Sequence, residues 1–336
     1  MLLVNNPGDW EHVYAPLRHA KWHGCTPTDL GFPFFLFIVG VSITLALQPP
    51  PERDIPRSML ARGVLLRAAR IVGLGLALHA CSWILLDYAH YRPWGVLQRI
   101  GLCFAAGGMF ALYTNARLQW VCIGALLLGH WTLLAAGGSY ERFANLGDRF
   151  DTALFGPMLY VVDAASGRGH DPEGLFSTLP AIATTLLGVR AGAWLRSGGQ
   201  RALILAGLAA LALGALWAQT LPFNKALWTG SYALWSGGSA LLVLALCHIA
   251  IDRRGWPALG RRFGVNAIAA YVGSAAMVYA LSALGLWQPI YAIGFAQWMT
   301  PLCGPFLPSL VFAVAFVGLW WLILRAMDRR GWHLRI

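Results

Sequence analysis

The chain has 336 residues, of which 58% are hydrophobic and 12% charged, and its mean hydropathy is +0.59. This composition excludes an ordinary water-soluble domain. The formal net charge of +11 does not indicate nucleic-acid binding, because the basic residues are scattered among apolar segments. The 6 cysteines lack CxxC spacing, so neither a disulfide framework nor a zinc site is predicted from them. We expect an all-α, polytopic transmembrane helix bundle.

Apolar segments of about 20 residues, the length that crosses a bilayer, recur along the chain. They predict nine to ten spans in a single integral membrane domain over residues 1–336. Nine spans are expected over residues 31–48, 64–86, 94–113, 119–137, 174–194, 202–219, 228–250, 265–286 and 304–325, with a remnant of a tenth at the N-terminus. The longest connection, 138–173, contains enough aromatic residues to fold as a cap over the membrane mouth.

Charge predicts the orientation of the chain. One set of alternate connections holds most of the arginines, and the set that begins with residues 1–30 holds most of the acids. By the positive-inside rule the arginine-rich set and the C-terminus are cytoplasmic, so residues 1–30 and 138–173 face outward. An acidic outer face would favour a cationic ligand such as an amine, although a solvated loop surface would carry the same charges.

The stretch RHAKWHGCTPTDL places ionisable residues directly before the first span. His19 could act as a general base or a nucleophile, with Asp29 fixing its tautomer and Asn5 donating a hydrogen bond to an oxyanion. His12 and His23 share the loop, so zinc binding and plain loop polarity are alternatives. Because the spacing of these residues is irregular, we predict that no metal is bound.

The motif HDPEGLFSTLP precedes another span. Asp171 fits the N-cap of that helix, with Pro172 at its first position. Glu173 is not needed for a cap, so it could bind a substrate amine or hydroxyl.

Other candidate ligand-binding residues lie near the predicted outer ends of the spans. Trp22 fits either an interfacial anchor or a platform for a sugar ring, and Lys225 could simply extend to the interface. Arg99 lies one turn inside a span, where a charge is costly unless it is paired, for example with Asp87, or faces a wet cavity. The predicted substrate-binding residues are Trp22, Gln98, Arg99, Asp171, Glu173, Asn224 and Lys225.

Basic residues cluster at the predicted cytoplasmic ends of three spans. Such clusters bind anionic lipid head groups, and they would equally hold the phosphates of a donor that arrives from the cytosol. The candidates are Arg62, Arg67, Arg70, Arg190, Arg261, Arg262 and Asn266.

The segments LVNNPG, HAKWHGCTPTDLGFPFFLFIVG, GVLQRIGL, HDPEGLFSTLPAI, NKALWTGSY and GVNAIAAY together resemble the motifs of the heparan-alpha-glucosaminide N-acetyltransferase family and its bacterial relatives. These are transmembrane acyltransferases, and the likeness covers nearly the whole chain. The resemblance implies an enzyme that delivers acetyl from cytosolic acetyl-CoA, as co-substrate, to the amine of a glucosamine across the membrane. The catalytic histidine of the family matches His19, and its catalytic asparagine, in a Val-Asn pair, matches Asn5.

The resemblance carries further expectations. It implies a bacterial inner-membrane location, with lipid and an amino sugar as partners and a homodimer as the assembly. It also implies a helix before the Val-Asn pair: either the native start lies upstream of Met1, or the helix is absent and the enzyme would have an exposed groove beside the site. His19 would serve as general base or would itself carry the acetyl group. The alternatives are a transporter of N-acetylglucosamine or a related amino sugar, and an acyltransferase with another polymer or acyl chain.

Overall fold

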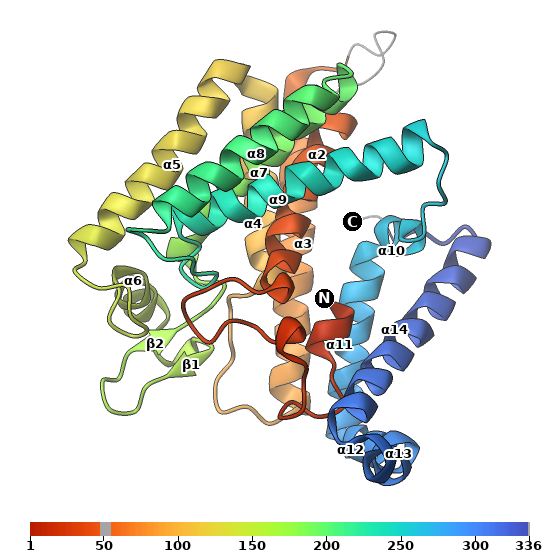
Figure 1. Cartoon of the computed structure of the whole chain (residues 1–336). Coiled ribbons are helices and arrows are strands. Elements are labelled where there is room, and N and C mark those ends of the chain that lie inside the picture. Colours follow the sequence, from red (N-terminus) through yellow and green to blue (C-terminus); the bar gives the residue numbers. More distant parts are fainter. Residues whose placement is uncertain (48–54, 335–336) are drawn as a thin grey trace.

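The computed structural model describes residues 1–47 and 55–334 and shows a bundle of long helices (Figure 1). Within these residues, 8 helices are long and apolar enough to cross a membrane, and a bent pair of helices raises the number to 9. The spanning helices are α2 (Gly31–Ala46), α3 (Arg57–Leu85), α4 (Val96–Tyr113), α5 (Ala116–Ala136), α7 (Leu175–Arg196), α8 (Gln200–Trp217), α9 (Gly230–Cys247) and α14 (Phe306–Arg329). The all-α, polytopic prediction is confirmed.

The bent pair begins with α11 (Ala267–Ala283), which coincides with the predicted span 265–286. After Gly285, whose φ of 67° suits glycine, the chain turns by 100° into a second helical segment, 287–303. This segment consists of α12 (Trp287–Tyr291), a π-helical turn and α13 (Gln297–Cys303). It is not among the predicted spans. The other eight predicted spans each coincide with one spanning helix, the boundaries differing by a few residues except at the start of α3.

Shorter elements occupy the connections. The first loop contains α1 (Leu2–Asn5) and two 3₁₀ turns, η1 (Ala15–Leu17) and η2 (Pro27–Leu30). The cap, residues 138–173, contains α6 (Leu146–Phe155), η3 (Gly156–Met158) and the antiparallel strands β1 (Val161–Val162) and β2 (Gly169–His170). After α9 the chain continues through the π-helical turn η4 (His248–Arg253) and α10 (Arg261–Val265).

Helix α7 forms the centre of the bundle. In the apolar 18-residue stretch of α7, 78% of the residues are buried, against 50% or less in the other long spanning helices. The main hydrophobic core joins α7 to α2, α4 and α9 through residues such as Leu36, Cys103, Leu186 and Tyr232, all fully buried. Small residues let α8 and α9 approach closely, because Gly238 of α9 packs on the backbone of Gly207 in α8.

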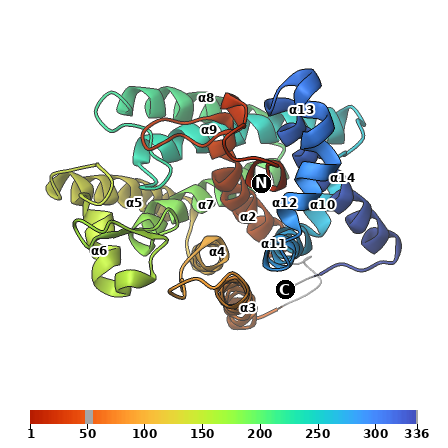
Figure 2. The same ribbon diagram turned by 90° about the horizontal axis from the view of Figure 1, so that it is seen from below.

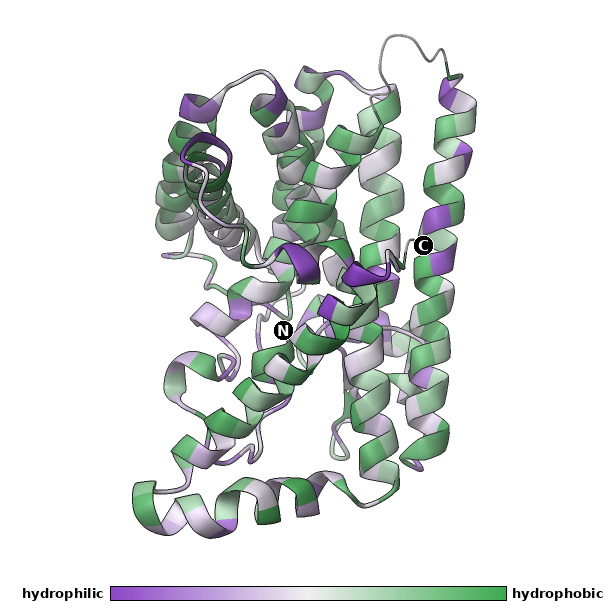
Figure 3. Cartoon of the chain, turned by 90° about the vertical axis from the view of Figure 1, so that its right-hand side faces the viewer, coloured by the Kyte–Doolittle hydropathy of each residue, from purple (hydrophilic) through white to green (hydrophobic). Residues whose placement is uncertain are grey.

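Four connections gather at one end of the bundle. Residues 1–30, 87–95, 138–173 and 218–229 meet there, together with α12 and α13 at the lower side of Figure 1. Viewed from this end, the N-terminus lies beside α2, α11 and α12, whereas α3 and α4 lie farther away on one side (Figure 2). The long helices are mainly hydrophobic, with hydrophilic residues concentrated at helix ends, in loops and along α3 (Figure 3). Within the described residues, the four connections named above thus share one end of the bundle.

Candidate active site

His19 and Asp29 form a hydrogen-bonded pair at this end of the bundle. The turn η2 places Asp29, whose Oδ2 accepts hydrogen bonds from Ala20 N, Thr26 N and Thr26 Oγ1, each at 3.0 Å. This leaves Oδ1 for the imidazole, and His19 Nδ1 lies 2.6 Å from it. The Asp29 side chain is 1% exposed and that of His19 is 42% exposed. Because a carboxylate only accepts hydrogen bonds, this pairing favours the neutral tautomer of His19 in which Nδ1 donates to Asp29 and Nε2 carries the lone pair.

Lys225 lies beside this pair. The loop before α9 is shaped by Asn224, whose Oδ1 accepts Leu227 N at 2.8 Å and whose backbone N donates to Thr229 Oγ1 at 3.1 Å. The loop brings Lys225 Nζ to 3.7 Å from Asp29 Oδ1 and 3.2 Å from His19 Nδ1. Burial lowers the pKa of Lys225, although the charges of Glu173 and Asp29 oppose this shift. Asn224 itself is fully buried, so its part here is to shape the loop.

Arg92, in the connection between α3 and α4, binds two acids at the end of the cap, just before α7. Its Nε and Nη2 bind Asp171 Oδ2 and Oδ1 at 2.7 and 2.5 Å, and Nη2 also binds Glu173 Oε2 at 2.7 Å. The side chain of Asp171 is 0% exposed and that of Glu173 is 12% exposed. Burial raises the pKa of Glu173, but the positive charges of Arg92 and Arg99 outweigh it and leave this pKa lowered. Of the two acids, only Glu173 is open to a ligand.

The predicted capping role of Asp171 is wrong. Helix α7 begins at Leu175, after Gly174 and not at Pro172. Its first N–H groups are bound by Asp151 of α6, whose Oδ1 lies 3.1 Å from Leu175 N and 3.3 Å from Phe176 N. Asp171 instead forms an ion pair with Arg92, because a buried carboxylate needs a countercharge.

Arg99 is completely buried on α4. Its Nη2 donates to Gly174 O at 2.8 Å and to Ser177 Oγ, and its guanidinium lies 5.3 Å from the ring centre of Trp228. Among the described residues Nε and Nη1 have no hydrogen-bond partner. Asp87 is exposed and does not pair with Arg99, so the structural alternative considered for this charge is not observed.

Asn5 lines a cavity of about 180 Å³ between α1 and α11. The wall includes Tyr271, Ser274 and Tyr279 of α11. Met1 lines the same cavity and lies next to Gly31, two residues after Asp29. His19 is not part of the wall, and no hydrogen bond joins Asn5 to His19 within the described residues. The structure thus brings His19 together with Asp29 but places Asn5 at a separate cavity.

Comparison with known proteins places the chain. A model of the family described as "Heparan-alpha-glucosaminide N-acetyltransferase, catalytic" matches residues 13–222. The chain belongs to this family. It is 27% identical to human heparan-alpha-glucosaminide N-acetyltransferase and 26% identical to the mouse protein of that name, in each case over 81% of this chain. These alignments cover 50% and 51% of the two relatives, so the chain spans about half the length of the curated relatives it matches.

The family match includes His19, Asp29 and the Arg92 cluster, whereas Asn5 and Lys225 lie outside it.

Two of the predicted substrate-binding residues, Gln98 and Trp22, form hydrogen bonds with other parts of the protein. Gln98 donates to Pro93 O at 3.1 Å and packs against Gly75 of α3. Trp22 donates to Tyr140 O of the cap at 3.0 Å.

The predicted donor-binding residues lie on different helix pairs. On α3, Arg62 and Arg70 are exposed, and Arg67 lies 5.1 Å from the ring centre of Phe104 in α4. Arg190 of α7 donates to Gln119 Oε1 of α5 at 3.3 Å. Among the described residues, no hydrogen bond or ion pair joins Arg190 to the arginines of α3.

The third group lies against α14. Arg261 is 3.5 Å from Asp328, and Arg262 lies over the ring of Trp321 at 4.9 Å. Asn266 Oδ1 accepts Leu334 N at 3.1 Å. Over the described residues, no group of three or more His, Cys, Asp or Glu side chains is arranged to hold a metal ion.

Sequence reasoning missed three residues that build the site. Arg92 pairs with both acids of the HDPEG motif, Tyr232 donates its hydroxyl to Asp29 O at 2.7 Å, and Asp151 binds the start of α7. Only Arg92 could have been predicted from the sequence. A basic residue just before a span, at the end of the bundle where most acids lie, is expected to pair with an acid. The other two contacts join distant parts of the chain and leave no local pattern.

Proposed function

We propose that this chain is a membrane-bound N-acetyltransferase that transfers acetyl from acetyl-CoA to the amine of a glucosamine-type sugar. The observation that carries the proposal is the His19–Asp29 pair, with its buried carboxylate and exposed imidazole. It occurs in a chain that belongs to a family named for this reaction. The proposal treats residues 1–336 as one catalytic domain with the cap, residues 138–173, above the site.

The geometry suits general-base catalysis. An amine must lose a proton before it attacks, and the Nε2 lone pair of His19 can accept that proton while Asp29 stabilises the resulting imidazolium. The amine nitrogen then bonds to the thioester carbonyl carbon, the carbon–sulfur bond breaks, and the thiol of coenzyme A leaves with the proton. In a two-step route Nε2 attacks the thioester carbonyl carbon and the thiol of coenzyme A leaves; the amine then attacks the carbonyl carbon of the acetyl-histidine, and the His19 imidazole is released.

Glu173 and Asn5 have separate parts in the proposal. Glu173, the partly exposed acid of the Arg92 cluster, would attract the amine in its protonated form. Asn5 would donate to the oxyanion that forms on the thioester carbonyl. Since Asn5 lines the cavity and His19 does not, the acetyl group would lie between the cavity and His19.

The donor and acceptor would approach from opposite faces. Acetyl-CoA would place its phosphates on arginines of the arginine-rich face, Arg62, Arg67, Arg70, Arg190, Arg261 and Arg262, with Asn266 beside them. The amino sugar would reach His19 from the other face, which the positive-inside rule assigns to the outside of a bacterial inner membrane.

The test is transfer of labelled acetyl from acetyl-CoA to glucosamine by the purified protein in nanodiscs. We expect labelled N-acetylglucosamine from the wild type, and a loss of about a hundredfold or more with His19→Ala. The matched control is His12→Ala, which removes a histidine from the same loop that is also paired with an aspartate, Asp9, at 2.7 Å. Sugar uptake by vesicles without labelled product would contradict the proposal and favour transport.

The two routes separate in one further measurement. Incubation with labelled acetyl-CoA and no acceptor leaves label on His19 in the two-step route. Kinetics that require both substrates bound before any product leaves identify the direct route.

A further inference from the structure

The cap contains a second histidine–aspartate pair, which the proposed reaction does not use. His170 Nδ1 lies 2.7 Å from Asp148 Oδ1, and each of the two side chains is 4% exposed. His19, by contrast, is 42% exposed. The enclosed pair is therefore suited to holding structure and not to meeting a substrate.

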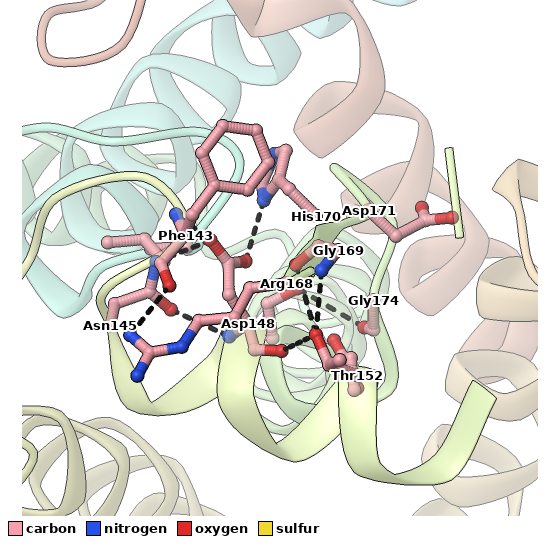
Figure 4. A network of polar contacts seen from close by, with 12 residues as sticks. Phe143, Asn145, Asp148, Thr152, Arg168, Gly169, His170, Asp171 and Gly174 are labelled. Carbon is pink, nitrogen blue, oxygen red and sulfur yellow. Dashed lines mark hydrogen bonds and ion pairs between the residues drawn. The ribbon is translucent and has the colours of Figure 1, made fainter. Parts of the chain in front are cut away.

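Asp148 is fixed on its other side as well. Its Oδ2 accepts Phe143 N at 2.6 Å and Asn145 Nδ2 at 2.8 Å, and Asn145 Oδ1 in return accepts Asp148 N at 2.8 Å (Figure 4). Phe143 has a φ of 65°, a conformation that residues other than glycine rarely adopt. The bond to Asp148 stabilises this strained turn. The hydrogen bonds of Asp148 and Asn145 thus fix the position of the His170 ring, and we call this network the platform.

Trp22 of the first loop rests on this platform. Its ring centre lies 5.1 Å from that of His170 in an edge-to-face arrangement, and its Nε1 donates to Tyr140 O at 3.0 Å. Trp22 follows His19 by three residues, and between them Ala20 N donates to Asp29 Oδ2 at 3.0 Å. The short segment after His19 is therefore held by Asp29 at one end and by the cap at the other.

We propose that Trp22 and His170 are positioning residues, through which the cap keeps the His19 imidazole against Asp29. A half-exposed imidazole has little packing of its own, so its orientation depends on the backbone that carries it. The inference rests on the proposed function for its kinetic consequence. Its structural consequence, the order of residues 19–25, is independent of any reaction.

Four variants test the inference. His170→Asn keeps an N–H donor for Asp148 but removes the ring that contacts Trp22. Trp22→Leu removes both the ring contact and the bond to Tyr140 O, whereas Trp22→Phe keeps a ring. The control is His248→Asn, which alters the exposed pair of His248 with Asp252, 2.7 Å apart, beyond the far end of α9.

Backbone hydrogen exchange is measured by mass spectrometry on the full chain in nanodiscs. We expect the peptide covering 19–25 to exchange about tenfold faster in both variants, because His170→Asn removes the aromatic contact and Trp22→Leu removes that contact together with the hydrogen bond to Tyr140 O. Peptides of α7 and the control variant should match the wild type, and Trp22→Phe should recover most of the protection. The value of kcat should fall about tenfold while KM for acetyl-CoA changes little.

Unchanged exchange over 19–25 in His170→Asn and in Trp22→Leu would overturn the inference. An equal rise in α7 would also overturn it, because that result means general destabilisation. If Trp22→Leu does not fold, the inference is tested by the other two variants: His170→Asn should exchange faster over 19–25, and Trp22→Phe should stay close to the wild type. A wild type that transfers no acetyl would refute the proposed function and leave the exchange data to decide this inference.

Discussion

Gly40 of α2 and Gly188 of α7 bring two helix backbones into direct contact. A Cβ atom on Gly188 would lie 1.9 Å from Phe37 O, and one on Gly40 would lie 2.0 Å from Thr185 O. Only glycine allows this approach, since the nearest atoms are backbone. The two helices carry Asp29 and Glu173 just before their first turns, so their crossing sets the distance between the two halves of the site.

Replacing Gly188 should therefore separate the helices. We expect Gly188→Ala to lower the free energy of unfolding by about 2 kcal/mol or more and to lower the thermal midpoint in detergent. The control is Gly124→Ala in α5, where no heavy atom lies within 4 Å of the added Cβ. Equal midpoints for Gly188→Ala and wild type would show that this contact is not required.

Asp29→Asn should abolish most of the proposed activity without unfolding the chain. One carboxylate oxygen faces three donors and the other faces His19 Nδ1, so an amide must turn an N–H toward one of them. If that N–H faces His19, it favours the imidazole tautomer with its lone pair on Nδ1, and Nε2 can no longer accept a proton. We expect kcat to fall about 10²- to 10⁴-fold with KM little changed. Asp9→Asn, next to His12, is the control, and a loss of the same size there would remove the special role of Asp29.

Arg92→Lys should destabilise the cap end of the protein. A lysine cannot reproduce the two parallel bonds to Asp171, so one of two neighbouring acids loses its countercharge. We expect the free energy of unfolding to drop by about 2 kcal/mol. Arg168→Lys is the control, because Arg168 is exposed and makes a single bond to Phe143 O at 3.3 Å. The measurement is thermal unfolding at pH 7, where equal effects for both variants would contradict the prediction.

The pH dependence of stability should reveal Asp151. Burial raises the pKa of Asp151 to about 6, although the N–H groups of Phe176 and Leu175 oppose this shift. A folded-state pKa above the unfolded value gives stability that is present at acid pH and is lost as the pH rises through about 6. We expect this loss to be about 2 kcal/mol between pH 4 and pH 7.5.

Asp151→Asn keeps an oxygen for the two N–H groups and cannot ionise. The variant should therefore match the wild type near pH 4 and be more stable than it at pH 7.5, as measured by thermal midpoints. Asp163→Asn, on the exposed side of the cap, should follow the wild-type curve between pH 5 and pH 8. Parallel curves for Asp151→Asn and wild type would refute the assignment.

The spans were predictable because each depends on about 20 apolar residues, a property of the local sequence. The turn of 100° after α11 was not, since Gly285 marks a turn but does not set its direction. The same distinction holds within the site. His19 and Asp29 share one loop, and their residue types indicate their pairing.

Contacts between distant segments left no such signal. Asp-Pro-Glu-Gly fits a helix cap, and the prediction failed because Asp151 reaches that helix from another element while Arg92 binds Asp171 from 79 residues away. A local pattern cannot show which of two carboxylates a folded chain will bring to a helix end. Likewise, nothing near Asn5 indicates that α11 will form the opposite wall of its cavity.

The first loop is fastened to the last helix. Ser309 of α14 and Asp9 are 300 residues apart, and each donates a hydrogen bond to the other at 3.0 Å. Membrane helices are made in order, so the segment that leads to His19 must wait through nearly the whole of synthesis before its final support arrives. Until α14 is inserted, the first loop therefore lacks the attachment that joins Asp9 to Ser309.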